Sequence, residues 1–227
     1  MHPAAPLPPD PERAPGGGGA HPAAGLDYER LVFFSDAVFA IAITLLALEV
    51  RLPALRGDPA SGLLQALADL LPDIAAYALS FLVVGVFWVG HHRVFRFVAG
   101  YDYTLVWLNV LFLLGVAFVP VPSRVIAEYG DTAAATVFYA GCLLVVALLE
   151  YAVWAYAARG RRLLRPEATP GVVRYLGLRI LALAAVFALS LPLVLVSPYL
   201  AQASWALAPV ALGALRRRFP QEHHLRG

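Results

Sequence analysis

The sequence predicts an all-α integral membrane protein with six transmembrane helices per subunit, and three observations lead to this fold class. Hydrophobic residues make up 60% of the 227 residues and charged residues only 14%, an apolar balance beyond that of soluble domains of this size. Apolar windows of about 20 residues, the length that crosses a hydrocarbon core of about 30 Å, recur along the chain. The basic residues gather in alternate connections between these windows, as expected of loops on one side of a membrane.

Six windows meet the length and polarity of a membrane span. The expected spans are residues 31–50, 72–90, 104–122, 132–156, 177–196 and 199–215. Only Ser197 and Pro198 separate the last two, and Pro192 and Pro209 interrupt them. A kinked or re-entrant hairpin is therefore expected there, and the same region would also allow five or seven spans.

The spans define a six-span membrane domain at residues 27–217 with a tail at each end. Residues 1–26 are rich in Pro, Ala and Gly and lack the apolar core of a cleavable signal, so we expect a disordered cytosolic tail. Residues 218–227 form the expected C-terminal cytosolic tail.

The connection after the first span has a pattern of its own. Ser61 is expected to cap a short helix with four leucines on one face, as in a segment lying on the outer membrane surface; these are Leu63, Leu64, Leu67 and Leu71. A plain loop is the alternative.

All 17 basic residues are arginine, and their distribution predicts the orientation. With the N-terminus inside, 14 arginines fall in inner segments and three, Arg51, Arg56 and Arg124, in outer loops. Basic loops stay preferentially in the cytosol, so both termini are expected there, in agreement with an even number of spans. The Arg-rich segment from Arg159 to Arg179 fixes this orientation or binds anionic lipid, and the sequence favours orientation.

Asp36 places a carboxylate inside the first apolar helix. A charge in hydrocarbon costs roughly 3 kcal/mol or more, so it persists where it faces protein or water. Counting inward from the cytosolic ends places several polar side chains at the same depth. We therefore expect Asp36 to accept hydrogen bonds in an interhelical network, with Trp88, His91 or His92, and Asn109 as candidate donors. Trp107 is a further candidate member of this network.

Two points about this level stay open from the sequence. In the alternative to a buried network, the polar residues at the end of the second span only face water at the cytosolic surface; these are His91, His92, Arg93 and Arg96. Glu150, about two turns from the inner end of the fourth span, either pairs with Arg179 or stands as a protonated or snorkelling residue.

The opposite side of the first span carries an aliphatic stripe. At about 100° per residue, Leu45 and Leu48 lie within about 40° of Ile41 and Thr44 within about 60°, whereas Asp36 points about 140° away. The network and the stripe therefore face different directions. Periodicity alone favours a stripe that faces lipid or packs against protein over one that lines a pore.

Three motifs together resemble the transmembrane protein 175 family, the potassium channels of endosomes and lysosomes with their prokaryotic relatives. The first is Arg30-x-x-x-Phe34-Ser35-Asp36 at the start of an uninterrupted apolar helix. The others are Phe87-Trp88-x-x-His91-His92 in the second span and Trp107-x-Asn109 in the third. The resemblance covers roughly residues 28–217, and this single-repeat chain resembles the prokaryotic members.

The resemblance implies a homotetrameric potassium channel in which the first span of each subunit lines a central pore. It places the constriction at Ile41, further apolar layers at Leu45 and Leu48, and a hydroxyl layer that favours potassium over sodium at Thr44. The signature then packs against spans two and three without touching the ions. The sequence contains no Thr-Val-Gly-Tyr-Gly filter, so we expect modest selectivity.

Three other classes were compared with a channel. A metal-dependent intramembrane hydrolase needs more ligands than His91 and His92, which point about 100° apart. A proton-coupled transporter built on Asp36 and Glu150 is the main alternative, although transporters favour broken helices and the first span has no Gly or Pro between 31 and 50. A non-transporting scaffold is the third.

We thus expect a channel that is not an enzyme, with no cofactor, no bound metal beyond potassium in transit and no nucleic-acid partner. Its expected partners are potassium ions, the lipid bilayer and copies of itself. The expected location is a prokaryotic plasma membrane, with both termini in the cytosol.

Overall fold

The computed structural model describes residues 22–50 and 59–219, with side chains for 28–50 and 62–219. This part of the chain is almost entirely helical, which confirms the predicted all-α class. The helices are α1 (Pro22–Leu48), α2 (Pro59–Asp69), α3 (Leu71–Arg96), α4 (Tyr103–Phe118), α5 (Pro120–Tyr129), α6 (Ala133–Ala158), α7 (Pro170–Leu193), α8 (Pro198–Ser204) and α9 (Leu207–Arg218), with a 3-10 turn at Arg159–Arg161.

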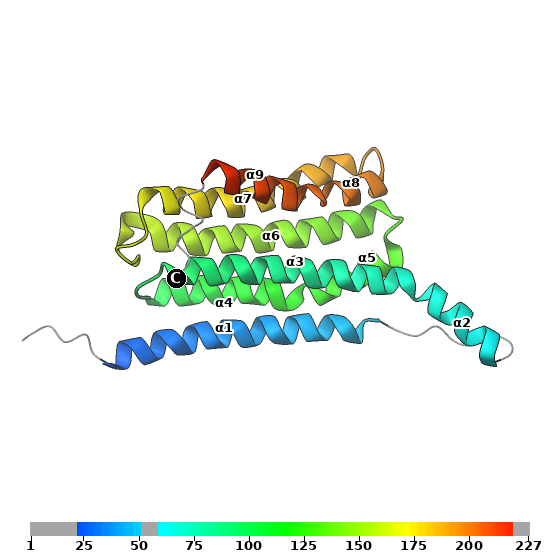
Figure 1. Ribbon diagram of the computed structural model, residues 1–227, viewed down its shortest axis with the longest axis horizontal. Coiled ribbons are helices and arrows are strands. Elements are labelled where there is room, and N and C mark those ends of the chain that lie inside the picture. The colour runs from blue at the N-terminus through cyan, green and yellow to red at the C-terminus, as the bar shows by residue number, and fades with distance from the viewer. Residues whose placement is uncertain (1–21, 51–58, 220–227) are drawn as a thin grey trace, which may run out of the picture.

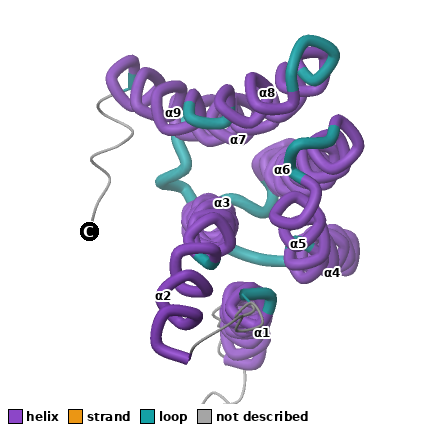
Figure 2. Tube along the Cα trace, turned by 90° about the vertical axis from the view of Figure 1, so that its right-hand side faces the viewer, coloured by secondary structure: helices purple, strands orange, loops and turns teal. Residues whose placement is uncertain are grey.

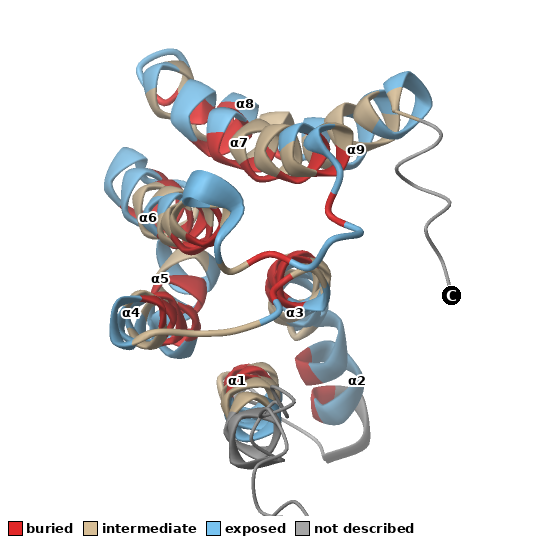
Figure 3. Ribbon diagram, turned by 90° about the vertical axis from the view of Figure 1, so that its left-hand side faces the viewer, coloured by how far each residue is buried: buried red, intermediate tan, exposed pale blue. Residues whose placement is uncertain are grey.

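The long helices run side by side in layers (Figure 1). Helix α1 packs against α3 and α4, α4 packs against α6, and α6 packs against α7. Helices α8 and α9 lie along α7. Seen end-on, α1 and the α7–α9 group lie at opposite ends of the stack, with α3, α4 and α6 between them (Figure 2). Buried residues occupy the sides of the helices that face one another (Figure 3).

Five helices of the described chain are long and apolar enough to cross a membrane, one fewer than the predicted six. The sixth predicted span, 199–215, consists of α8 and α9, which are separated at Trp205 and Ala206. Proline has no N–H, so Pro209 cannot bond the carbonyl four residues back at Trp205, and a helix breaks one turn before such a residue. Both α8 and α9 pack against α7, so the break divides the predicted span into two short helices that remain beside α7.

Several helices begin or end at other residues than the predicted spans, by up to nine residues. Helix α1 begins at Pro22, inside the tail expected at 1–26, whose first 21 residues lie outside the described ones. The third predicted span divides at Val119, before Pro120, and continues as α5 to Tyr129. Helix α7 begins at Pro170, seven residues before the predicted start, and α9 extends to Arg218, the first residue of the expected C-terminal tail.

Helix α2 begins at Pro59, so Ser61 lies inside it and is not its N-terminal cap. Its predicted apolar face is uncovered: Leu64 is 76% exposed, and Leu63 and Leu67 are also exposed. Other polar residues do cap helices. Asp102, Thr132 and Thr169 accept hydrogen bonds from the backbone N–H groups three residues on, at 2.9, 3.2 and 3.3 Å, and thereby begin α4, α6 and α7.

The α3–α4 and α6–α7 loops, both predicted to lie inside the cell, are hydrogen-bonded to each other at one end of the bundle. Val98 and Leu164 form an antiparallel bridge, flanked by N–H···O bonds of 2.8 Å. Asp102 accepts from Tyr156 Oη at 2.8 Å and pairs with Arg162 at 2.9 Å. The hydrogen bond from the Leu105 N–H lowers the pKa of Asp102 most, and the contacts with Tyr156 and Arg162 lower it further. This loop carboxylate therefore stays ionised well below neutral pH.

Helices α4 and α6 approach closely at Gly115. A Cβ atom placed there would lie 3.1 Å from Val146 Cγ2 and 3.6 Å from Leu149 Cδ1. Small residues permit such close backbone approach in membrane bundles, where lipid supplies little hydrophobic force between helices.

Gly115→Val should therefore lower the stability of the bundle by about 1–3 kcal/mol, because the branched side chain overpacks the α4–α6 contact. The measurement is the apparent thermal-unfolding midpoint of the purified protein in detergent. Gly141→Val on α6 is the matched control, since a Cβ there meets nothing within 4 Å. Equal midpoints for the two variants would show that the close approach at Gly115 contributes nothing.

Candidate functional site

Helix α1 has one packed face and one bare face. Its buried side chains, Ser35, Phe39, Ala42 and Leu46, follow a spacing of four, three and four residues. At about 100° per residue these four point within about 60° of one another, toward α3 and α4.

The predicted stripe lies on the opposite face of α1 and is uncovered in the single chain. Ile41 is 58% exposed, Leu45 41% and Leu48 70%, and Thr44 is exposed as well. Within the stripe, the Thr44 hydroxyl donates to the Ile41 carbonyl at 2.8 Å.

A continuous chain of buried hydrogen bonds joins α1, α3 and α4. His91 Nε2 of α3 donates to Asn109 Oδ1 of α4 at 2.9 Å, because the amide oxygen can only accept. Asn109 Nδ2 donates to Ser35 Oγ of α1 at 2.9 Å, and Ser35 Oγ donates to the Leu31 carbonyl at 2.9 Å. All three side chains are at most 2% exposed. The chain therefore fixes the rotation of α1 against its two neighbours.

Aromatic rings from the same three helices enclose the His91 ring. Phe112 of α4 stacks on it with centroids 5.5 Å apart and planes 7° apart, and Phe95 of α3 lies 4.3 Å away. Phe39 of α1 approaches at 5.6 Å with its ring tilted. The polar chain is thus sealed by apolar surface, where a hydrogen bond is strong and a missing one costly.

Asp36 makes a separate contact at the edge of the packed face. Trp88 Nε1 donates to Asp36 Oδ1 at 2.9 Å, as the sequence predicted for the tryptophan. Neither histidine takes this place. His91 bonds Asn109, and the exposed His92 lies beside the Trp88 ring with centroids 5.8 Å apart. The single network expected around Asp36 is therefore two separate contacts, because Ser35, not Asp36, points directly at α4.

The other residues singled out by the sequence are peripheral in the single chain. Trp107 is 50% exposed and packs edge-on against Tyr103 with centroids 6.0 Å apart. Phe34 is 54% exposed, and Arg30 is exposed. Of the four signature residues, only Ser35 is buried.

Glu150 of α6 lies fully inside the bundle against Gly90 of α3. A Cβ atom on Gly90 would collide with the Glu150 carboxylate, so the glycine provides the space that this side chain occupies. Of the two alternatives for Glu150, the ion pair with Arg179 is not formed: the arginine lies within electrostatic range, but the described residues include no ion pair between them within 4 Å. One Glu150 oxygen, Oε1, is buried with no hydrogen-bond partner among the described residues.

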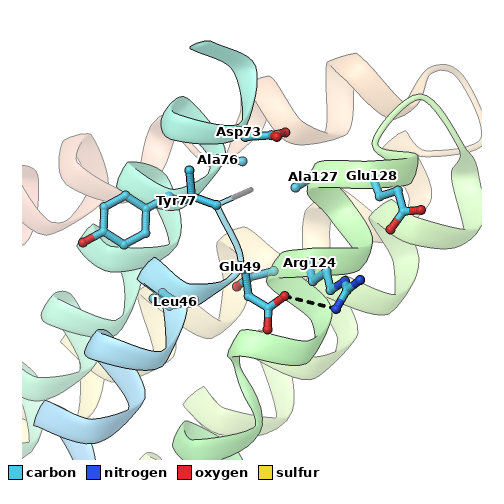
Figure 4. Close-up of a pocket in the computed structure, with 10 residues that line it drawn as sticks. Leu46, Glu49, Asp73, Ala76, Tyr77, Arg124, Ala127 and Glu128 are labelled. Carbon is cyan, nitrogen blue, oxygen red and sulfur yellow. Dashed lines mark ion pairs between the residues drawn. The ribbon is translucent and has the colours of Figure 1, made fainter. Parts of the chain in front are cut away.

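The C-terminal end of α1 adjoins a cavity of about 320 Å³ that is lined by several charged residues (Figure 4). Glu49, directly after the last residue of the stripe, points toward Arg124 of α5, and their charged atoms lie 3.4 Å apart. Asp73 of α3 and Glu128 of α5 also line the cavity. This ion pair connects the C-terminal end of α1 to α5, as the chain of hydrogen bonds connects its N-terminal half to α3 and α4.

The aromatic enclosure is not among the features predicted from the sequence, although the spacing of its residues indicates it. Phe39 follows Ser35 by four residues, Phe95 follows His91 by four and Phe112 follows Asn109 by three. Residues three or four apart share a helix face, so each polar residue of the chain has a phenylalanine one turn away on its own side.

These features define a multi-pass α-helical membrane protein whose first helix is anchored on one face and bare along the other. Comparison with known proteins then assigns the family. Residues 30–120 match the family described as the endosomal/lysosomal potassium channel TMEM175. The chain is 38% identical over 188 residues to a potassium channel of Streptomyces collinus, covering 81% of this chain and 90% of that protein.

Two further matches, one to a sequence and one to a solved structure, come from Chamaesiphon minutus. A potassium channel of that organism is 41% identical over 142 residues, covering 61% of this chain and 70% of that protein. The crystal structure of a lysosomal potassium-selective channel TMEM175 homolog from the organism aligns with a TM-score of 0.72 and 31% identity, over 84% of this chain and 98% of that one. The chain belongs to the TMEM175 family, which confirms the predicted resemblance.

Replacing Asn109 tests the buried chain of hydrogen bonds from His91 to Ser35. Asn109→Leu should destabilise the bundle by about 1–3 kcal/mol, because it leaves His91 Nε2 and Ser35 Oγ buried without their shared partner. In a double-mutant cycle with Ser35→Ala, the coupling measured from thermal unfolding should be about 0.5–3 kcal/mol. Thr104→Leu, at an exposed position of the same helix, is the control. Strict additivity of the two substitutions would contradict a connected chain.

Proposed function

We propose that this protein is a subunit of a homotetrameric potassium channel whose conduction pathway is lined by α1. The observation that carries the proposal is the division of α1 into a packed face and a bare stripe of Ile41, Thr44, Leu45 and Leu48. Relatives named as potassium channels in two bacteria support the choice of ion. The aliphatic stripe, for which periodicity alone favours lipid or protein packing, is here assigned to the pore.

A ring of four Ile41 side chains around an axis would make a narrow neck of low polarity. Water leaves such a constriction readily, so small changes in its width gate conduction by wetting and dewetting. Leu45 and Leu48 extend the apolar lining toward the C-terminal end of α1.

Thr44 supplies the polar layer of the proposed pathway. Its hydroxyl hydrogen is committed to the Ile41 carbonyl, so the hydroxyl presents oxygen lone pairs to its surroundings. Four such oxygens replace part of the hydration of a cation, and potassium gives up its water more readily than sodium. A single hydroxyl layer supports only modest selectivity, because it is not the dense set of oxygen ligands found in carbonyl-lined filters.

The proposed location is a prokaryotic plasma membrane with both termini in the cytosol. The distribution of arginine supports this orientation. The contact between the α3–α4 and α6–α7 loops also brings the arginines at the end of α3, Arg93 and Arg96, to the same end of the bundle as the Arg-rich α6–α7 loop.

A proton-coupled transporter built on Asp36 and Glu150 is not favoured. Asp36 is engaged with Trp88 at the edge of α1, whereas Glu150 is enclosed behind α3 against Gly90. Helix α1 also continues unbroken from Pro22 to Leu48, unlike the interrupted helices around transporter sites.

Ile41→Asn tests the pore assignment. In potassium-loaded liposomes the wild-type protein should dissipate a potassium gradient without a counter-gradient of protons, and the variant should raise sodium flux several-fold by wetting the neck. Leu189→Asn makes the same chemical change on α7, at a side chain 67% exposed and far from α1, and should leave both fluxes unchanged.

Potassium flux that is absent, or strictly tied to a proton gradient, would refute the channel proposal. The mass of the detergent-solubilised protein checks the assembly in the same preparation. A stable monomer would leave the stripe with no axis to line.

Asp36→Ala should lower the yield of assembled protein and leave the potassium-to-sodium flux ratio unchanged, because the carboxylate faces Trp88 and not the stripe. Asp36→Asn keeps an acceptor for the indole N–H and should recover part of the yield. The measurements are size-exclusion yield and the liposome flux ratio. A well-assembled Asp36→Ala protein with altered selectivity would place Asp36 on the ion path.

A further inference from the structure

An apolar groove lies between the C-terminal part of α6 and the N-terminal part of α7. Its volume is about 480 Å³, within the range of about 300–1,000 Å³ typical of small-ligand clefts. Tyr151, Trp154 and Leu181 line it among other apolar residues, and Arg159 and Arg174 line the end nearer the α6–α7 loop.

Small residues create this groove. A Cβ atom on Gly177 would sit 3.6 Å from Trp154 Nε1 and 3.8 Å from Tyr151 Cε2, so any larger side chain at 177 would extend over the ring that lines it. The indole N–H of Trp154 donates to the Val173 carbonyl at 3.1 Å and holds that ring between the two helices. The groove is thus a defined feature of the α6–α7 contact.

The two arginines give the groove one charged end. Arg159 and Arg174 are both exposed, and neither pairs with an acidic side chain among the described residues. Arg159 directly follows α6 and Arg174 lies in the second turn of α7, yet both line the same cavity, which gives that end of the groove two positive charges. Arginine is suited to phosphate because its planar N–H donors match the geometry of two phosphate oxygens.

We propose that this groove binds one anionic phospholipid, with the phosphate at Arg159 and Arg174 and an acyl chain along Tyr151, Trp154 and Leu181. The proposal rests on charge complementarity at one end and apolar surface along the remainder, the combination that basic interhelical pockets present to lipid headgroups. Helix α7 lies at the opposite end of the stack from α1, so a lipid here leaves the stripe of α1 untouched (Figure 2). The proposed lipid site is separate from the proposed ion pathway, and the proposal does not depend on ion conduction.

Native mass spectrometry of the full-length protein in detergent tests the site with two probes of equal acyl chains, phosphatidylglycerol and phosphatidylcholine. Wild-type protein should retain phosphatidylglycerol several-fold more than phosphatidylcholine. R159Q/R174Q should lose that preference, and Gly177→Leu should retain less of the anionic lipid because it fills the groove. R216Q/R217Q removes the same charge from exposed positions on α9 and should behave as wild type.

Thermal unfolding provides a second readout on the same proteins. Phosphatidylglycerol should raise the unfolding midpoint of the wild type and of R216Q/R217Q but not of R159Q/R174Q. If R159Q/R174Q and R216Q/R217Q lost the stabilisation by phosphatidylglycerol equally, the effect would come from general surface charge, and the proposal would be overturned. Equal retention of phosphatidylcholine, or displacement of the lipid by excess inorganic phosphate, would overturn it as well.

Discussion

The buried chain of hydrogen bonds from His91 through Asn109 to Ser35 is the constraint on which the placement of α1 depends. Lipid is as apolar as a leucine side chain, so hydrophobic burial alone does not decide how a membrane helix is rotated against its neighbours. Polar groups enclosed by Phe39, Phe95 and Phe112 do decide it, because an unmade bond in that surrounding is costly.

Fixing one face of α1 determines what the opposite face presents. Ser35 points at α4, so Ile41 and its neighbours point away from the subunit, and the proposed pore lining follows from the anchoring without any contact of its own. The Glu49–Arg124 pair connects the C-terminal end of the same helix to α5. Between these two attachments the helix has no proline or glycine at which to bend, which suits a pore wall of constant shape.

The most instructive difference between expectation and structure concerns Asp36. A charge in an apolar helix is the most conspicuous polar feature of a sequence, and the predicted network is therefore centred on Asp36, with His91 or His92 as one donor. The structure gives the buried position to the neutral Ser35 and leaves Asp36 at the edge with Trp88, because a hydroxyl can be enclosed at lower cost than a carboxylate. Glu150 shows the same limit: its cavity depends on Gly90 of another helix, a relation that no local pattern contains.

The sequence by itself determined the membrane class, the positions of the long helices, the two faces of α1 and the family, because these follow from hydropathy, helical period and short motifs within one segment. Tertiary structure decided which polar side chains meet, where the sixth predicted span breaks, and that α6 and α7 enclose a groove. Each of these depends on the distance and rotation between helices far apart in the chain. Those quantities are set by packing and by the burial of polar groups, which the order of residues along one helix does not specify.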